Sequence, residues 1–259
     1  MIRETIKNRE GLNLVIQIEK NENSKALVFI MHGLGGFKEQ PIFQEIAGIL
    51  KEQQFTVVRF DATHSIGESE GNLEDATFAS YYQDLEDVIN YSKTQDWYEE
   101  PFFLIGHSLG GYCILRYTVN FPEKVIAVAP LSTAISGQFF LESPEIGLIA
   151  DDWKKTGLRQ WESKPKPGYI KKLKYRFVEE SLNHNILLDA DKIKCPVLLV
   201  VGEEDKTTPL NQQQILFDAL KIDKEFHIIK RTGHTFEGEN ASKELGCIIK
   251  NWIIRMING

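Results

Sequence analysis

Residues 102–111 have the sequence FFLIGHSLGG, an apolar run that leads directly into Gly-x-Ser-x-Gly. The run is typical of a buried strand, and residues 112–120 continue with a helical pattern. A serine at so tight a turn holds a strained backbone, and Gly106 and Gly110 let the strand and the helix approach closely enough to impose it. The pattern therefore predicts that the Ser108 hydroxyl projects from a strand-to-helix turn, beside the unpaired N–H groups of a helix N-terminus.

Strands and helices alternate along most of the chain. Together with the run that begins at Phe102, short apolar segments predict strands at residues 26–31, 55–61, 125–131, 197–201 and 226–230. Helical spacing predicts helices at residues 41–54, 77–94, 112–120, 210–220 and 241–256. An N-terminal hairpin is expected from residues 2–8 and 12–20. This alternation predicts an α/β fold, with a mostly parallel sheet that helices cover on both faces.

The composition is typical of one globular domain that spans residues 1–259, with 42% hydrophobic and 26% charged residues. The formal net charge of -7 disfavours a nucleic-acid partner, since such proteins usually carry a basic excess. The N-terminus lacks the apolar core of a signal peptide, and no apolar run approaches membrane-spanning length. The three cysteines show no paired spacing and are expected to be structural. We therefore expect a cytoplasmic protein with no integral membrane segment.

Polar residues follow two of the later predicted strands. Asp205 comes shortly after the strand at residues 197–201, and His234 comes shortly after the strand at 226–230. Reactive groups on such a sheet gather at the C-terminal ends of its strands. Ser108, Asp205 and His234 also occur in the order serine, acid, histidine that a hydrolase with this turn requires. Glu204 is the alternative acid, and a solvated turn is the alternative interpretation of the acidic residues.

These motifs resemble those of the α/β hydrolases, most of all the serine carboxylesterases, cinnamoyl (feruloyl) esterases and lysophospholipases. The resemblance covers nearly the whole chain apart from a middle insertion, and it implies the α/β-hydrolase fold. Its supporting motifs, besides the turn at Ser108, are His32-Gly33, Arg59-Phe60-Asp61, Gly67-Glu68-Ser69-Glu70-Gly71, Gly202-Glu203-Glu204-Asp205 and Gly233-His234. The chain departs from the family between Asp61 and Ser69, where the loop is longer and has Thr63-His64-Ser65-Ile66 in place of a glycine.

The chemistry of a serine nucleophile assigns a role to each of Ser108, His234 and Asp205. A serine hydroxyl reacts only when a base takes its proton, so His234 is expected to act first as general base and then as general acid. Asp205 is expected to orient the imidazole and stabilise its charged form. Attack on an acyl carbonyl creates an oxyanion that two preorganised N–H donors stabilise. The resemblance implies that these donors are the backbone N–H groups of Leu34 and Leu109. No metal or other cofactor is expected.

The expected activity is hydrolysis of a small-molecule carboxylic ester through an acyl-serine intermediate at Ser108. A thioesterase or a peptidase would use the same groups. A non-catalytic hydrolase-like binding protein is the alternative from another class, and such a protein would be expected to lack one of the three residues. His32 and His107 neighbour the functional loops and are expected to support them by hydrogen bonding.

The alternation of strands and helices stops over residues 134–187, a segment too long for an ordinary connection. We expect a small lid inserted into the domain, which sets specificity from above the site. Residues 154–176 carry nine Lys or Arg residues against a single acid, Glu162. The same insertion holds the aromatic residues Phe139, Phe140, Trp153, Trp161, Tyr169 and Tyr175. Such a surface is typical of an ordinary solvated face over a few packed aromatics, and weak binding of an anionic substrate or lipid is the alternative.

Overall fold

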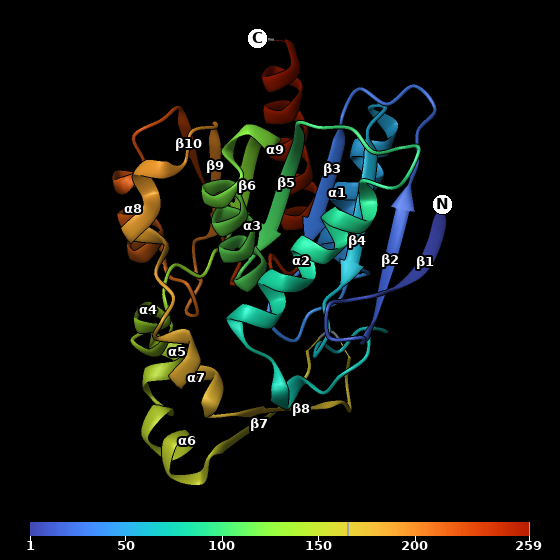
Figure 1. Ribbon diagram of the computed structural model, residues 1–259. Coiled ribbons are helices and arrows are strands. Elements are labelled where there is room, and N and C mark those ends of the chain that lie inside the picture. Colours follow the sequence, from blue (N-terminus) through green and yellow to red (C-terminus); the bar gives the residue numbers. More distant parts are fainter. Residues whose placement is uncertain (165, 259) are drawn as a thin grey trace.

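The predicted apolar runs form a central sheet whose strand order is β1-β2-β4-β3-β5-β6-β9-β10 (Figure 1). The computed structural model describes residues 1–164 and 166–258. The strands are β1 (Ile2–Lys7), β2 (Asn13–Glu19), β3 (Leu27–Met31), β4 (Thr56–Asp61), β5 (Phe102–His107), β6 (Val125–Leu131), β9 (Val197–Gly202) and β10 (Lys224–Ile229). β2 pairs antiparallel with β1 and with β4, and the other neighbours are parallel. The expected mostly parallel sheet is confirmed.

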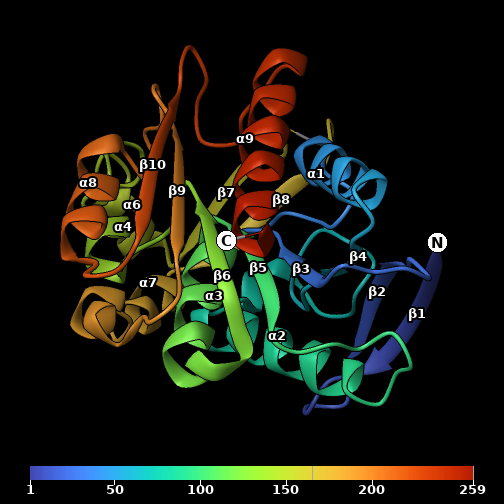
Figure 2. The same cartoon turned by 90° about the horizontal axis from the view of Figure 1, so that it is seen from above.

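Helices cover both faces of this sheet. They are α1 (Pro41–Glu52), α2 (Phe78–Ser92), α3 (Leu109–Asn120), α8 (Leu210–Ala219) and α9 (Glu239–Asn258). Buried side chains of α1 and α9 belong to one core cluster, and those of α2 and α3 belong to the other. Figure 2 shows these two pairs of helices on opposite sides of the strands. The fold is therefore the expected α/β arrangement, with a core on each side of the sheet.

The two cores explain why β3 is apolar at every position. In β3, Leu27, Phe29 and Met31 pack into the core beneath α2 and α3. The intervening Val28 and Ile30 pack into the core beneath α1 and α9. Because successive side chains of a strand point to opposite faces, a sheet covered on both faces requires apolar residues throughout.

The turn between β5 and α3 has the strained geometry that its sequence predicts. Ser108 has φ 54° and ψ -117°, a conformation that a non-glycine residue rarely adopts. The Ser108 N–H donates to the carbonyl of Leu131 at 2.9 Å, and the Ser108 carbonyl accepts from the N–H of Ala134 at 2.9 Å. A Cβ placed on Gly106 would lie 2.4 Å from the carbonyl oxygen of Gly110. The strained residue is thus held between close backbone contacts and hydrogen bonds to the end of β6.

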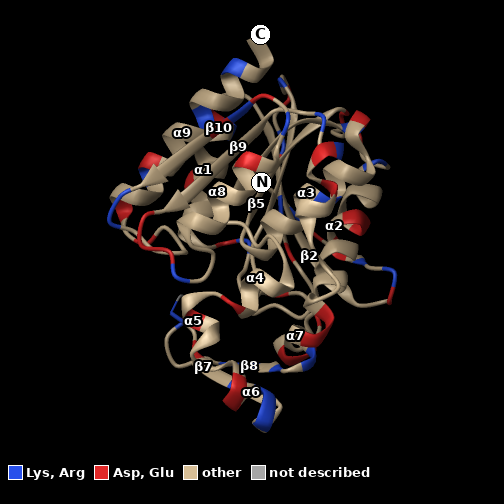
Figure 3. Ribbon diagram, turned by 90° about the vertical axis from the view of Figure 1, so that its left-hand side faces the viewer, with Lys and Arg blue, Asp and Glu red and all other residues tan. Residues whose placement is uncertain are grey.

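The segment between β6 and β9 folds into several short elements of its own. They are α4 (Gly137–Leu141), α5 (Pro144–Gly147), α6 (Ala150–Thr156), β7 (Leu158–Glu162), β8 (Ile170–Lys174), α7 (Arg176–Ser181) and the 3-10 helix η3 (Ile186–Lys192). Strands β7 and β8 form an antiparallel pair separate from the main sheet, which the sequence did not predict. Figures 1 and 3 show this segment gathered at one end of the sheet. Its role as a lid over residues 134–187 stays a prediction.

The three cysteines differ in their surroundings. Cys113 and Cys195 are buried, and Cys247 is exposed on α9. The expectation of structural cysteines suits the two buried thiols, but Cys247 does not pack into a core. All three are free thiols.

The close contact between Gly106 and Gly110 beneath Ser108 predicts that adding a methyl group at Gly106 lowers the stability of the protein. Gly106→Ala would force its Cβ against the backbone of Gly110, which cannot move aside as a flexible side chain can. We expect the free energy of unfolding to fall by about 3 kcal/mol. Gly48→Ala is the control, because its Cβ in α1 would meet no atom within 4 Å. Urea denaturation should show no loss for the control, and an equal loss for both variants would contradict the interpretation.

Candidate active site

Three predicted residues lie in hydrogen-bonding contact at the C-terminal end of the sheet. Ser108 follows β5, Asp205 follows β9 and His234 follows β10. His234 Nε2 lies 3.0 Å from Ser108 Oγ, and His234 Nδ1 lies 2.9 Å from Asp205 Oδ2. A chain of two hydrogen bonds thus connects the carboxylate to the hydroxyl through the imidazole.

The carboxylate of Asp205 is buried, and both of its oxygens accept hydrogen bonds. Its Oδ1 accepts hydrogen bonds from the N–H groups of Thr207 at 2.8 Å and Thr208 at 2.9 Å. Burial raises the pKa of Asp205, but the charge of a protonated His234, the hydrogen bond from that ring and the Thr208 N–H hold the pKa well below its usual range. Asp205 is therefore ionised at neutral pH and can stabilise a positive charge on His234.

The alternative acid lies elsewhere. Glu204 is exposed, and its backbone N–H donates to the carbonyl of Thr232 at 2.9 Å. The neighbouring Glu203 accepts a hydrogen bond from the N–H of Arg231 at 3.1 Å. Asp205 is thus the residue of this acidic group whose carboxylate reaches His234.

The backbone N–H groups expected to bind the oxyanion are those of Leu34 and Leu109. Both residues line the cavity that contains Ser108, and neither N–H donates to another described residue. The loop that carries Leu34 passes close to the serine, because a Cβ placed on Gly33 would lie 2.8 Å from Ser108 Cβ. Leu109 begins α3, so its N–H has no acceptor within the helix. Two free donors of this kind suit an oxyanion.

A buried tyrosine holds the Leu34 loop, and the sequence did not reveal it. The N–H of Gly35 donates to the hydroxyl of Tyr81 at 3.2 Å. The Tyr81 ring also packs edge-on against His32, with ring centroids 5.8 Å apart. In the sequence, Tyr81 has only the spacing of a core position on α2, which gives no sign of its contact with the loop.

The two histidines next to the functional loops make backbone hydrogen bonds. His32 Nδ1 donates to the Gly33 carbonyl at 2.7 Å, and His32 Nε2 accepts from the N–H of Ala62 at 2.9 Å. His107 Nε2 donates to the carbonyl of His234 at 2.7 Å. Burial lowers the pKa of His107 to about 3, so this ring is neutral at physiological pH. Both rings connect loops, as the sequence analysis expected.

A buried ion pair supports the rim of the site. Lys38 Nζ lies 2.9 Å from Asp61 Oδ2, and both side chains are 1% exposed. The N–H groups of Lys38 and Glu68 also donate to the Asp61 carboxylate. A Cβ on Gly67 would lie 2.2 Å from Asp61 Cγ, so only glycine fits there. In the longer loop that follows Asp61, the Thr63 hydroxyl donates to Asp84 at 2.7 Å.

A cavity of about 920 Å³ opens above Ser108. Its apolar wall includes Phe78, Phe140, Ile146, Trp161 and Phe177, most of them from the segment between β6 and β9. Residues from α5, β7, β8 and α7 thus surround the space that a substrate would occupy. Such a volume accommodates a small molecule or an acyl chain.

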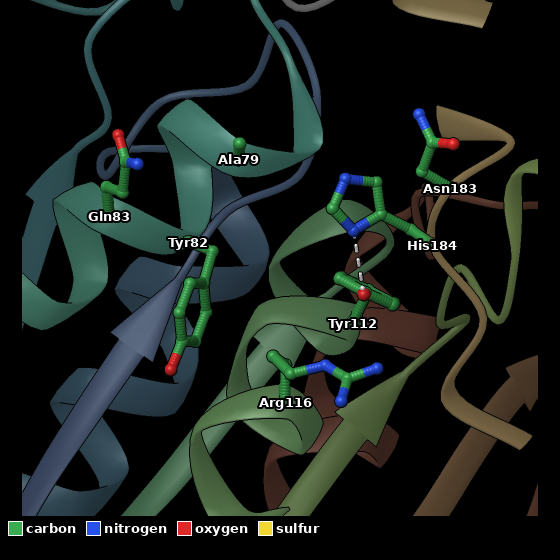
Figure 4. A pocket seen from close by; sticks show the side chains of 7 residues that line it. All are labelled: Ala79, Tyr82, Gln83, Tyr112, Arg116, Asn183 and His184. Atoms are coloured by element: carbon green, nitrogen blue, oxygen red, sulfur yellow. Dashed lines mark hydrogen bonds between the residues drawn. The ribbon is translucent and has the colours of Figure 1, made fainter. Parts of the chain in front are cut away.

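A second cavity, of about 370 Å³, is lined by His184 and Tyr112 among others (Figure 4), and Ser108 is not one of its lining residues. The hydroxyl of Tyr112 donates to His184 Nδ1 at 3.0 Å, and His184 Nε2 donates to Glu180 at 2.7 Å. The ring also stacks on Phe78, with centroids 5.2 Å apart. His184, for which the sequence carried no signal, thus anchors the end of α7 to α2 and α3.

The described residues contain no group of three or more His, Cys, Asp or Glu side chains arranged to hold a metal ion. In residues 1–164 and 166–258, no helix has the length and apolar character needed to cross a bilayer.

Known proteins share this fold and part of this sequence. Residues 22–156 match the family described as serine aminopeptidase, S33 (Hydrolase_4). The mouse palmitoyl-protein thioesterase ABHD10, mitochondrial, is 29% identical over 191 residues, which cover 72% of this chain and 59% of that protein. This chain therefore spans less than two thirds of that relative's length.

Two solved structures superpose over nearly the whole chain. Est1E from Butyrivibrio proteoclasticus with bound ferulic acid has a TM-score of 0.79 at 20% identity and covers 100% of both chains. Alpha/beta hydrolase domain-containing protein 10 from mouse has a TM-score of 0.79 at 24% identity and covers 99% of this chain and 100% of its own. Fold and site together define an α/β hydrolase. Because the family match spans more than half of its residues, the chain belongs to the serine aminopeptidase S33 family.

The ion pair at the rim predicts how the loops respond when one charge is removed. Lys38→Met leaves the buried Asp61 carboxylate without its ammonium partner. We expect the free energy of unfolding to fall by about 3 kcal/mol. Lys20→Met removes the solvent-facing pair with Asp96 and should change stability little. Urea denaturation measures both, and similar losses for the two variants would disprove the importance of the buried pair.

Proposed function

We propose that this protein hydrolyses carboxylic esters through an acyl-serine intermediate formed on Ser108. One observation carries the proposal: the hydrogen-bonded chain from Asp205 through His234 to Ser108, which ends at the floor of a cavity of about 920 Å³. A structural serine would have no need of a buried carboxylate and an imidazole in this order.

The reaction proceeds in two halves. His234 Nε2 takes the proton of Ser108 Oγ as the oxygen attacks the acyl carbonyl, and the protonated ring then gives that proton to the departing alcohol. A water molecule next attacks the acyl-serine while His234 accepts its proton, and His234 then gives this proton to Ser108 Oγ as the acid leaves and the free serine is restored. Asp205 stays ionised throughout and stabilises the imidazolium across the 2.9 Å contact.

The negative charge on the carbonyl oxygen requires its own donors. We assign this role to the backbone N–H groups of Leu34 and Leu109, which have no acceptor among the described residues. Losing one such donor typically costs roughly 3 kcal/mol of transition-state stabilisation. Tyr81 supports this arrangement by accepting a hydrogen bond from the N–H of Gly35.

A thioester is the second candidate substrate. The same groups would cleave it, and the 29% identical relative from mouse is a palmitoyl-protein thioesterase. The apolar wall formed by Phe140, Ile146 and Phe177 suits an acyl chain in either case. Peptidase activity, which the family description names, would also use this serine. The cytoplasmic location expected from the sequence stays a prediction, because the word mitochondrial describes the relative.

The proposal predicts complete dependence on the three residues. Ser108→Ala should lower kcat/KM for para-nitrophenyl esters by roughly 10⁴- to 10⁶-fold, because the nucleophile is gone. His234→Ala should have a similar effect, since among the described residues only His234 places a base in hydrogen-bonding contact with the hydroxyl. Circular dichroism and thermal unfolding show whether each variant is folded. Equal turnover by the native protein and folded Ser108→Ala would exclude this mechanism.

Labelling separates a hydrolase from a silent binding protein. An active-site phosphonate should attach to Ser108 in the native protein, as intact mass spectrometry can measure, and it should fail to attach to Ser108→Ala. Absence of labelling in the native protein would favour the binding protein. An octanoyl ester, thioester and amide, compared by kcat/KM, then decide among esterase, thioesterase and peptidase.

A further inference from the structure

Among the nine basic residues at 154–176, Lys171 has an unusual position. Its side chain is 8% exposed, and it lines the same cavity as Ser108. Most of the others reach acidic partners or solvent. Arg159 pairs with Glu145, Lys164 pairs with Glu237, and Lys174 and Arg176 pair with Asp75. Four of the nine basic residues are thus paired with carboxylates, and Arg159 and Lys164 of these also line the cavity.

Strand β8 directs Lys171 toward the loop beside the serine. Lys171 pairs with Trp161 across β7 and β8, and its Nζ lies 5.9 Å from the centre of the indole ring. A Cβ placed on Gly35 would lie 3.4 Å from the same Nζ. The next residue, Lys172, is exposed, as expected for a neighbour on the opposite face of the strand. The ammonium of Lys171 thus lies beside the loop that carries Leu34.

This ammonium has no counter-charge. No carboxylate of the described residues lies within ion-pair distance of Lys171 Nζ, and no hydrogen bond from this atom reaches a described residue. Burial, with a smaller contribution from the charge of Arg159, lowers the pKa of Lys171 to about 8. Lys171 is largely buried, but its ammonium is accessible from the cavity, so a bound ligand can supply the missing counter-charge.

Among the described residues, four of the five carboxylates that line the same cavity have partners, including Glu239 with Lys243, and Glu45 is the exception. Glu145 binds Arg159 at 3.0 Å and Glu237 binds Lys164 at 3.3 Å. Glu162 accepts a hydrogen bond from the N–H of Gly168 at 2.8 Å. Arg159 and Lys164 line the cavity as ion pairs with two of these carboxylates, so among the described residues the Lys171 ammonium is an unpaired charge beside Gly35.

We propose that Lys171 forms an anion-binding subsite, and that the ester cleaved at Ser108 carries a carboxylate in its acyl or leaving group. This inference rests on the proposed hydrolase function and adds a substrate class to it. A substrate carboxylate would complete the ion pair inside the cavity, where a charge-assisted hydrogen bond is strong. A neutral ester of the same size would leave the ammonium unpaired. Lys171 is therefore a residue that determines specificity and takes no part in the chemical step.

Matched substrates test the proposal. Para-nitrophenyl hydrogen suberate carries a carboxylate at the end of an acyl chain as long as that of para-nitrophenyl octanoate. A carboxy-substituted nitrophenyl octanoate carries the charge on the leaving group instead. We expect the native protein to prefer one of the two anionic esters to the neutral ester by roughly tenfold or more in kcat/KM. The anionic ester that the protein prefers shows whether the subsite binds the acyl group or the leaving group.

Two neighbouring lysines supply the variant and its control. Lys171→Met should abolish the preference, measured as the ratio of kcat/KM for the anionic and the neutral ester, and Lys171→Arg should restore much of it. Lys172→Met removes a charge from the exposed face of the same strand and should keep the preference. If Lys171→Met does not fold, Lys171→Gln serves the same purpose. A preference that is absent, that survives in a folded Lys171→Met, or that disappears equally in Lys172→Met would overturn the proposal.

The preference should also depend on pH. As pH rises through about 8, Lys171 loses its proton and the advantage of the anionic ester should disappear. The ratio of the two kcat/KM values cancels the pH dependence of the chemical step, which both substrates share. The other charged or titratable groups around Lys171 are Arg159 and Glu162 on β7, Glu74 and Asp75 on the 3-10 helix η1 (Leu73–Asp75), and His32. A ratio that stays constant up to pH 10 in the native protein would contradict the assignment.

A binding measurement separates this inference from the proposed function. Calorimetry should show that one of the two anionic esters binds Ser108→Ala at least roughly tenfold more tightly than para-nitrophenyl octanoate, and that Lys171→Met in the same background removes the difference. If the native protein cleaves no ester but this binding difference appears, the hydrolase proposal fails and the subsite stands. If esters are cleaved but neither a kinetic nor a binding difference appears, the subsite fails and the hydrolase stands.

Discussion

The closest backbone contact beneath Ser108 determines how the rest of the site is arranged. Gly106 and Gly110 bring β5 and α3 so near that a Cβ on Gly106 would overlap the Gly110 carbonyl. With the chain confined in this way, Ser108 takes a conformation with positive φ that ordinary strands and helices avoid. Hydrogen bonds to Leu131 and from Ala134 stabilise that conformation and join it to the end of β6. The serine is therefore held by backbone atoms, which leaves its side chain free to react.

Around this point, loops from distant parts of the chain are held by buried polar contacts. His32 joins the loop after β3 to the end of β4, and His107 joins the serine turn to the His234 loop. Tyr81 accepts from the N–H of Gly35, and the Lys38–Asp61 pair lies beneath the rim. Because each contact satisfies a polar group away from water, the loops have few alternative positions. This rigidity suits a site whose proposed chemistry needs donors and acceptors fixed in advance.

Much of this architecture follows from local sequence patterns, and particular residues show what those patterns could not predict. The apolar runs predicted the main strands, and the order of Ser108, Asp205 and His234 predicted three residues that the structure brings into contact. The choice between Asp205 and Glu204 needed the structure, since both follow β9 closely. The β7–β8 pair was not predicted because its strands are short and half-exposed, and their sequences do not alternate strictly between apolar and polar residues. Tyr81 and Lys171 have unremarkable neighbours in sequence, and their partners lie far away along the chain.

By itself, the sequence determined the class of fold, the strained serine turn and the order of the residues that meet there. It could do so because strand burial and the Gly-x-Ser-x-Gly turn depend on residues adjacent in the chain. Only the tertiary structure decided which acid reaches His234, which side chains hold the Leu34 loop, and which lysine of the basic insertion faces the cavity. Those outcomes depend on contacts between segments far apart in sequence, and burial of a single lysine cannot be read from a local run of charges.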